Sequence, residues 1–375
     1  MNFGDAVFEN EEKAIFNLRK LYTEYGFSKY KMSKFEEYDF YVRNKDFLVS
    51  DNIITFTDSD GKLMALKPDV TMSIIKSSKD IKGFVQKVYY NENVYRTSGD
   101  TGQVKEIMQV GLECIGDIDD YSIAEVVLLA AKSLECIDKD YVLDISHMGI
   151  IAESLAQSGL SDAGRNEVMN AFGEKNVHAI VDVCQKEGIK EEKTALLCEL
   201  SRLSGVPSQV IPKLKELSVS DGFSAAVSQL EDVSEMLKTN GCEGCTRIDF
   251  SVANNMKYYS GVAFKGFING IPGGVLSGGQ YDKLMKKLDR SAGAIGFAVY
   301  LDMLHWIEKA SSDFDVDVLL IYDQGAEVLE VGNAVKELSR NGKSVMVQRE
   351  IPKKLRYRQL IKLEKGKVNI LENNA

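Results

Sequence analysis

The chain is poor in the residues that build metal centres, disulfide frameworks and membrane spans. Among 375 residues it has three histidines, one tryptophan and five prolines, and its six cysteines are unevenly spaced. Such cysteines are typical of reduced thiols rather than of a disulfide framework. No stretch approaches the roughly 18 uninterrupted apolar residues of a membrane helix. We therefore expect no metal, no cofactor and no membrane association.

The sequence also lacks an apolar N-terminal segment and an excess of positive charge. Residues 1–14, MNFGDAVFENEEKA, lack the apolar segment of a secretory signal, which predicts a cytoplasmic protein. The formal net charge of −10 disfavours a broad grip on nucleic acid. One basic cluster, residues 352–367, is more typical of a solvated helix flank than of a phosphate-binding or partner-binding face.

The short catalytic motifs are equally absent. Cys242 and Cys245 form a single CxxC without a second pair, and the histidines stand apart, so structural roles are favoured for all of them. The glycine-rich run GGVLSGGQYD, residues 273–282, fits neither a phosphate loop nor a dinucleotide-binding turn. Its glycines are better suited to letting the backbone approach a ligand or a facing strand.

The patterns that are present predict helices around a sheet. A helix is expected from Asn10 to just before Gly26, because Ile15, Leu18 and Tyr22 share one face. Residues 40–72 contain short β-type runs, and DSDG between IITFT and LMAL predicts a hairpin turn. GFVQKVYYNENVYR and KEIMQVGLECIG predict two more strands, followed by a buried helix at YSIAEVVLLAAKSLECI.

The second half predicts a helical insertion and a small terminal unit. Helical patterns fill about 148–240, after which TRIDFSVA, YYSGVAFKGFI and GGVLSGGQYDKL resume the sheet and GAIGFAVYLDMLHWI indicates a glycine-broken helix. From residue 315, DVDVLLIY, GAEVLEVGNAVKELSRNG and KSVMVQ predict a βαβ crossover. The fold class is therefore α+β, with a core at 1–310 and a short α/β domain at 311–375.

Five motifs in order resemble the class II catalytic core of histidyl-tRNA synthetase over about residues 5–310. They are LKPDVT (66–71), YR…GQVKEIMQVGLECIG (95–116), YYSGVAF (258–264), GGQYDKL (278–284) and AIGFAVYLDML (294–304). This resemblance implies a class II aminoacyl-tRNA synthetase-like antiparallel sheet and a homodimer formed through the core. The proline of the family's first motif is missing from KMSKFEE, which leaves the dimer contact open.

The resemblance also implies an amino-acid pocket. The family's carboxylate and threonine near the substrate amino group match Asp69 and Thr71, and its paired tyrosines near the imidazole match a YY pair here. A glutamine and a glutamate that lie on one face of a strand are retained, as is the first arginine of the second motif. The implied histidine-binding residues are Asp69, Thr71, Arg96, Gln109, Glu113, Tyr258 and Tyr259.

The nucleotide half of that site is depleted. Ser98 replaces a glutamate of the family, residues 102–105 (GQVK) replace its GRxR loop, and Asn254 stands where the RGLDYY arginine would be. Asp302 and Met303 occupy the positions of the last glutamate and arginine. Adenylate formation requires fixed cations around the phosphates. We therefore predict no catalytic residues and no histidine adenylation.

This combination resembles the regulatory subunit of short-form ATP phosphoribosyltransferase, a non-catalytic paralogue of the synthetase. The resemblance implies a small catalytic subunit as partner in a hetero-octamer, histidine as the feedback effector of the first step of histidine biosynthesis, and no tRNA, since the C-terminal unit is short. Two alternatives stay open. One is a divergent histidyl-tRNA synthetase with arginines supplied by Arg247 or Arg290, and the other is a synthetase-like interaction protein that binds no amino acid.

Overall fold

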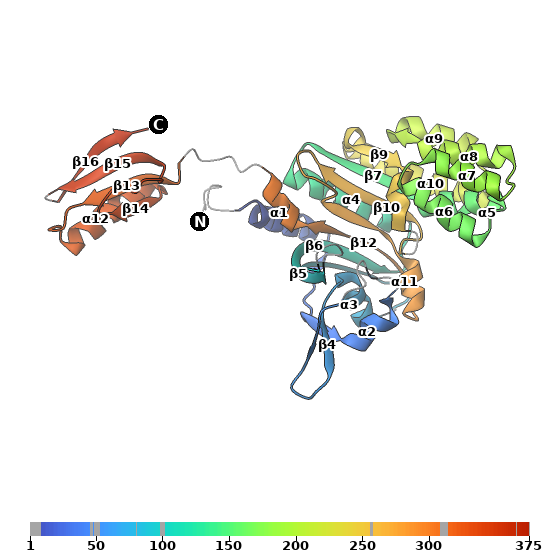
Figure 1. Ribbon diagram of the computed structural model, residues 1–375, viewed down its shortest axis with the longest axis horizontal. Coiled ribbons are helices and arrows are strands. Elements are labelled where there is room, and N and C mark those ends of the chain that lie inside the picture. Colours follow the sequence, from blue (N-terminus) through green and yellow to red (C-terminus); the bar gives the residue numbers. More distant parts are fainter. Residues whose placement is uncertain are drawn as a thin grey trace. The chain divides into compact units, whose positions relative to one another are not determined.

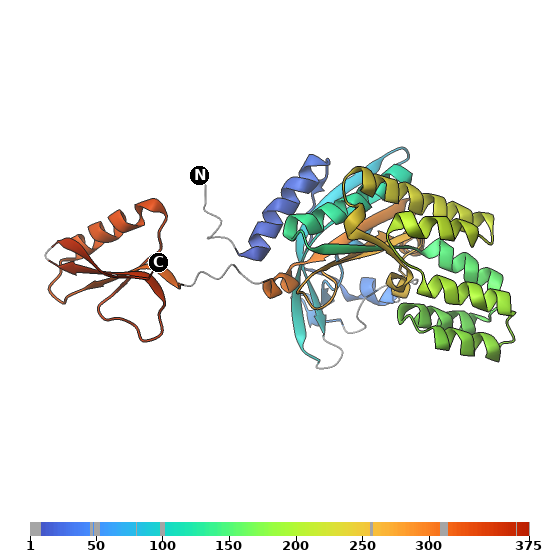
Figure 2. The same ribbon diagram turned by 90° about the horizontal axis from the view of Figure 1, so that it is seen from above.

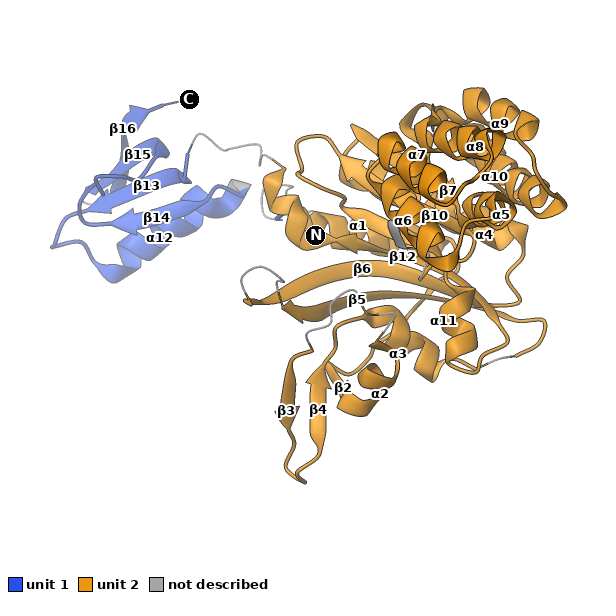
Figure 3. Ribbon diagram, turned by 45° about the vertical axis from the view of Figure 1, so that its right-hand side comes forward, with its two compact units in different colours: residues 1–9, 308–375 blue, residues 10–307 orange. Residues whose placement is uncertain are grey.

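The chain forms two compact units in the computed structural model, which describes residues 9–45, 48, 53–79, 81–97, 102–255, 258–307, 314–364 and 366–374. The larger unit spans Asn10–Ile307, and the smaller one is formed mainly by residues 314–374 (Figure 3). Within the described residues no helix is long and apolar enough to cross a membrane.

The larger unit is built on a nine-stranded sheet in the described part of the chain, with the order β1-β5-β6-β12-β11-β10-β7-β9-β8 (Figure 1). Its strands are β1 (Ser28–Lys29), β5 (Val85–Thr97), β6 (Val104–Gly116), β7 (Tyr141–His147), β8 (Ser204–Gly205), β9 (Thr246–Asp249), β10 (Val262–Ile268), β11 (Leu276–Gln280) and β12 (Gly293–Tyr300). The predicted antiparallel pairing is confirmed for the central strands, whereas the pairs β1–β5 and β7–β9 are parallel.

Strands β5 and β6 form the long hairpin that the sequence predicts. They pair from Val85 opposite Gly116 to Thr97 opposite Val104. Residues 98–101 of the connecting loop, including the Ser98 position, lie outside the described residues. The hairpin therefore supplies two adjacent rows of side chains to each face of the sheet.

Helices α1 (Asn10–Glu24) and α4 (Asp120–Ile137) cover one face of this sheet, as Figure 2 shows together with Figure 3. In α1 the buried residues Ala14, Leu18 and Tyr22 recur every four positions, which is the spacing of one helical face. Helix α4 is buried along most of its length, because it lies between the sheet, α1 and α10. Both helices were predicted.

The opposite face of the sheet carries short elements. They are α2 (Tyr38–Arg43), α3 (Val70–Ser77), α11 (Asp282–Lys287) and a small sheet of β2 (Phe35–Glu37), β4 (Leu63–Leu66) and β3 (Thr55–Thr57). The β3–β4 hairpin was predicted, but the expectation of only β-type runs in 40–72 was wrong, since α2 and the start of α3 are helical. These elements pack into a second apolar cluster that includes Tyr41, Met72 and Leu284.

The predicted helix at GAIGFAVYLDMLHWI is instead strand β12 followed by the 3-10 helix η5 (Leu301–Trp306). β12 lies between β11 and β6 in the middle of the sheet, and Ala294, Ile295 and Phe297 are buried on both of its faces. A strand buried on both faces is apolar at consecutive positions, so its period does not distinguish it from a buried helix.

Six helices lie between β7 and β9, where helical patterns were predicted. They are α5 (Met148–Ser158), α6 (Asp162–Gly173), α7 (Val177–Lys186), α8 (Glu191–Arg202), α9 (Pro207–Glu216) and α10 (Asp221–Thr239). The 3-10 helix η3 (Glu243–Cys245) connects this helical segment to β9, and a second 3-10 helix, η4 (Phe250–Asn255), follows β9. His147 caps α5, because its Nδ1 accepts a hydrogen bond from the Gly149 amide at 3.0 Å.

The smaller unit contains the predicted βαβ crossover. Its elements are β13 (Val316–Tyr322), α12 (Val328–Leu338), η6 (Ser339–Asn341), β14 (Val345–Gln348), β15 (Tyr357–Glu364) and β16 (Lys367–Asn373), and β13 is parallel to both β14 and β15. The expectation of a helix flank at residues 352–367 was wrong, because strand β15 occupies the middle half of this cluster. Its basic side chains alternate with Ile361 and Leu363, which pack against α12.

Candidate amino-acid-binding site

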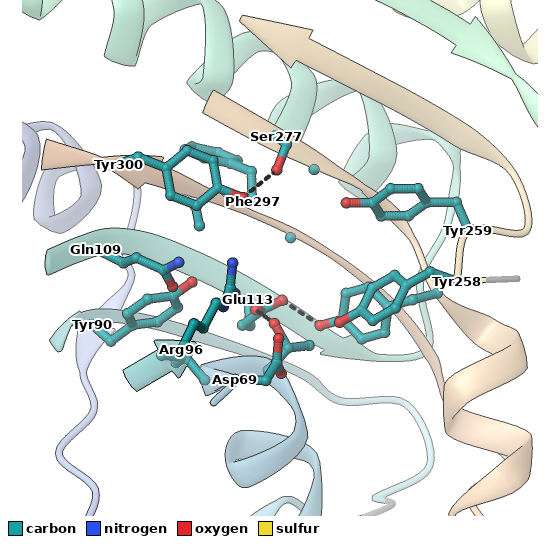
Figure 4. A pocket seen from close by; sticks show the side chains of 16 residues that line it. Asp69, Tyr90, Arg96, Gln109, Glu113, Tyr258, Tyr259, Ser277, Phe297 and Tyr300 are labelled. Carbon is teal, nitrogen blue, oxygen red and sulfur yellow. Dashed lines mark hydrogen bonds between the residues drawn. The ribbon is translucent and has the colours of Figure 1, made fainter. Parts of the chain in front are cut away.

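A cavity of about 160 Å³ lies on the face of the large sheet that α4 leaves uncovered. Residues from strands β5, β6, β11 and β12, from the start of α3 and from the segment before β10 line it (Figure 4). The structure brings all seven predicted residues into this lining: Asp69, Thr71, Arg96, Gln109, Glu113, Tyr258 and Tyr259. Its volume is below the roughly 300–1,000 Å³ of drug-sized pockets, which suits a ligand as small as an amino acid.

The floor of the cavity follows from the register of β6 and β12. Two cross-strand pairs contribute both of their members to it: Glu113 opposite Gly296, and Gln109 opposite Tyr300. Between them Ala298 lines the cavity opposite Gly111, over which the Tyr90 hydroxyl lies. Gly296 and Ala298 have little or no side chain, so the cavity lies above them, and the longer side chains of Glu113, Gln109 and Tyr300 surround it. A Cβ atom on Gly296 would lie 1.8 Å from Oε2 of Glu113, so only glycine permits this carboxyl group to lie across β12.

Glu113 is the most deeply buried acid of the site, with 1% of its surface exposed. The Thr71 hydroxyl donates to its Oε1 at 2.6 Å, and the Tyr281 hydroxyl donates to its Oε2. Burial, assisted by the nearby Asp69 charge, raises the pKa of Glu113 to about 8 against the opposing effect of these two hydrogen bonds. With this pKa the carboxyl group is mostly protonated at pH 7, and a ligand cation would favour its ionised form.

Asp69 is positioned by the start of α3. It is the N-cap residue of that helix, and its Oδ1 accepts a hydrogen bond from the Met72 amide at 2.9 Å. Burial raises the pKa of Asp69, while the Met72 hydrogen bond and the charge of Arg96 lower it. Arg96 also holds this segment, because its Nε donates to the Pro68 carbonyl at 3.1 Å.

Aromatic residues form much of the remaining wall. The rings of Tyr258 and Tyr259 meet edge to face with centroids 5.1 Å apart, and Tyr281 lies 6.0 Å from Tyr258. Tyr281 was part of a recognised motif, GGQYDKL, but was not singled out as a site residue. Among the lining residues that the sequence reasoning did not single out, four carry hydroxyl groups: Tyr90, Ser277, Tyr281 and Tyr300. The period-2 alternation of β5 through Tyr90 and Arg96 was the available signal for the first of them.

The cavity is short of cations. Among its described lining residues Arg96 is the only arginine or lysine. Arg290 and Arg247, the alternative donors, do not line it; the Arg290 guanidinium donates to the Ser78 carbonyl at 2.8 Å beyond the end of α3. Asp302 and Met303 are also outside the lining, and the side chain at 254 lies outside the described residues.

Metal chemistry has no support from the arrangement of side chains that the structure describes. No group of three or more histidine, cysteine, aspartate or glutamate residues in the described chain is placed to hold a metal ion. Asp69 and Glu113 are the only acids of the described cavity lining, and Glu113 already accepts two hydroxyl hydrogen bonds.

The fold and the cavity define a class II synthetase-like protein, and the model of the family described as histidyl-tRNA synthetase matches residues 3–304. The ATP phosphoribosyltransferase regulatory subunit of Caldanaerobacter subterraneus subsp. tengcongensis is 30% identical over 289 residues, which cover 76% of this chain and 75% of the relative. That of Oceanobacillus iheyensis is 28% identical over 300 residues, covering 79% and 74%. The chain therefore belongs to the histidyl-tRNA synthetase family and, within it, to the ATP phosphoribosyltransferase regulatory subunits.

Solved structures share this fold. An ATP phosphoribosyltransferase regulatory subunit/histidyl-tRNA synthetase from Bacillus halodurans superimposes with a TM-score of 0.74 at 22% identity, covering 90% of this chain and 88% of that one. The ATP phosphoribosyl transferase (HisG:HisZ) complex from Thermotoga maritima gives a TM-score of 0.63 at 20% identity, covering 78% and 98%. These matches support the predicted class II fold.

Proposed function

We propose that this chain is a non-catalytic regulatory subunit that binds free histidine in the cavity of the large unit. In this role it is required for the activity of an ATP phosphoribosyltransferase catalytic subunit and conveys feedback inhibition by histidine. The observation that carries the proposal is the composition of one cavity, where the seven residues predicted to bind histidine meet while only one cationic side chain lines the described wall. The names of the relatives supply the identity of the partner enzyme.

The charges of the cavity match those of a free amino acid. The ligand ammonium lies near Asp69 and Glu113, its carboxylate near Arg96, and its ring among Tyr258, Tyr259 and Gln109. Gln109 is 3% exposed, and its amide offers both a donor and an acceptor to an imidazole. Hydrogen bonds to ionised groups are the strong ones, so the two carboxyl groups and the guanidinium carry most of the affinity.

Adenylation is disfavoured by the same composition. Transfer of an adenylyl group develops negative charge on phosphate oxygens, and removing one preorganised donor from such a site typically costs about 10²–10³ in rate. A single guanidinium already engaged with the Pro68 carbonyl is a poor substitute for an arginine clamp. The subunit then acts through assembly rather than chemistry. Histidine can shift an assembly equilibrium only if it binds one assembly state more tightly than the other. Coupling free energies of this kind are typically about 1–3 kcal/mol.

Histidine binding is tested by calorimetric titration of the full-length chain. Glu113→Gln should weaken binding at least about thirtyfold, since truncating one partner of a buried charge pair costs roughly 2 kcal/mol or more. Glu125→Gln is the matched control, because Glu125 is also buried but pairs with Lys87 outside the cavity. Equal histidine affinity in the wild type and Glu113→Gln would contradict this site.

The regulatory role is tested by two further measurements. Histidine-dependent exchange between ATP and pyrophosphate should be absent, whereas a divergent synthetase would show it. A small phosphoribosyltransferase subunit should co-purify with the full-length chain, gain activity from it and lose that activity when histidine is added. The mass of the complex tests the hetero-octamer and the homodimer within it. Failure to associate would favour the interaction-protein alternative.

A further inference from the structure

Two hydroxyl groups meet at the end of the cavity that faces away from its acids. The side-chain oxygens of Ser277 on β11 and Tyr300 on β12 are 2.7 Å apart, and both residues line the cavity. Figure 4 shows this pair on the side opposite Asp69 and Glu113, with the cavity between them. Ser277 lies just outside the five motifs and Tyr300 lies within AIGFAVYLDML, but neither was predicted as a site residue.

The strand register explains how the two side chains reach each other. Ser277 is paired across the strands with Ala298, and Tyr300 is the next residue of β12 on the same face. Diagonal neighbours of this kind lie about 7–8 Å apart at their backbones, a gap that an aromatic side chain can span. Because Ala298 is small, the Tyr300 ring can extend above it to Ser277. The ring therefore lies over the small-residue floor.

Tyr300 is also anchored through its backbone. Its amide donates to the Val275 carbonyl at 2.8 Å, and it is the last residue of β12 before η5 begins. The ring is thus held at both ends, by the sheet and by the Ser277 hydroxyl. A side chain fixed in this way excludes a ligand group by volume, because moving it breaks a hydrogen bond inside a partly buried site.

We infer that Tyr300, held by Ser277, closes the cavity behind the carboxylate of a bound amino acid and so selects free histidine over histidine with a bulky group on its carboxyl carbon. This inference rests on the proposed function. With the ligand ammonium at Asp69 and Glu113 and its carboxylate near Arg96, the hydroxyl pair lies across the cavity from the ammonium, on the side toward which a group on the carboxyl carbon extends. Esters, amides and mixed anhydrides of histidine extend in that direction and meet the Tyr300 ring.

The test compares two probes, L-histidine and L-histidine benzyl ester, by calorimetric titration of the full-length chain. The wild type should bind histidine and discriminate strongly against the ester. Tyr300→Ala should narrow the affinity ratio by about tenfold or more, since steric discrimination by one group is worth roughly 10–200-fold. The ester lacks the carboxylate charge in every variant, so the change in the ratio reports the ring alone.

Further variants separate volume from hydrogen bonding and from misfolding. Tyr300→Phe keeps the ring but loses the hydrogen bond to Ser277, so its discrimination should lie between those of the wild type and Tyr300→Ala. Tyr300→Leu shortens the side chain with less disturbance than alanine and should give an intermediate ratio, so the inference stays testable if Tyr300→Ala does not fold. Tyr121→Ala, at an exposed tyrosine of α4 outside the cavity, should leave the ratio unchanged.

The outcomes distinguish this inference from the function on which it rests. Histidine binding with the same ester discrimination in wild type, Tyr300→Leu and Tyr300→Ala would overturn the role of Tyr300 alone. A wild-type chain that binds no histidine would overturn the proposed function and this inference with it. Discrimination in Tyr300→Phe no greater than in Tyr300→Ala would also overturn the inference, because the ring would then not be the selecting group.

Discussion

Replacing Glu113 by glutamine should make the empty protein more stable at neutral pH while weakening its histidine binding. Glutamine has the shape of the protonated carboxyl group and can still pair with the hydroxyls of Thr71 and Tyr281. The wild-type group is buried with a pKa of about 8, against 4.5 for an exposed glutamate. A residue of the binding site would thus be unfavourable for folding, as is common for functional sites.

The sign of the pH dependence follows from linkage. Because the folded-state pKa is the higher one, the contribution of Glu113 to stability is fully present below pH 4.5 and is lost as the pH rises to 8. Between pH 5 and pH 7 the free energy of unfolding of the wild type should fall by about 2–3 kcal/mol relative to that of Glu113→Gln. The other titrating groups contribute equally to both proteins, so their contributions cancel when the two free energies of unfolding are subtracted.

Urea unfolding of both proteins at a series of pH values measures this difference. Trp306, the single tryptophan, lies in the larger unit, so its fluorescence follows the unit that contains the site. Circular dichroism provides a second probe of the same transition. A constant difference between pH 5 and pH 7 would refute the raised pKa, and a less stable variant at pH 7 would refute the account of burial on which it depends.

Three further predictions concern the ligand and the glycines. Histidine binding at pH 7 should release up to about 0.9 proton as Glu113 ionises, measured by calorimetry in buffers of different ionisation enthalpy, and Glu113→Gln should abolish the release. Gly296→Ala should destabilise the protein by about 1–3 kcal/mol and abolish histidine binding, because its Cβ would meet the Glu113 carboxyl group; Gly325→Ala, where a Cβ meets nothing within 4 Å, is the control for urea unfolding and titration. Gly332→Ala, in α12 with open space around its Cβ, should stabilise the smaller unit by about 0.5–1 kcal/mol, and an unchanged or lower midpoint for that unit would contradict the helix-propensity argument.

Local pattern was enough for many elements of this fold. The spacing of Ala14, Leu18 and Tyr22 predicts α1, and the DSDG turn predicts the β3–β4 hairpin, because both depend on neighbours in the chain. β12 was misread because it lies within the sheet, where burial by non-local partners on both faces removes the alternation that a single segment would show. β15 was misread because residues 352–367 were interpreted by their charge, although Lys362 alternates with Ile361 and Leu363.

For the candidate site, too, some properties follow from the sequence and others only from the tertiary structure. By itself the sequence determined which side chains are available: the order of its motifs identifies Asp69, Gln109 and Glu113, and its missing arginines argue against adenylation. Only the tertiary structure decided how these groups are arranged. It raises the pKa of Glu113 by burial, fills one end of the cavity with Tyr300, and turns Arg290 to the end of α3. The physical reason is that protonation, volume and hydrogen bonding at the site depend on strand register and packing between segments distant in the chain, which no local pattern contains.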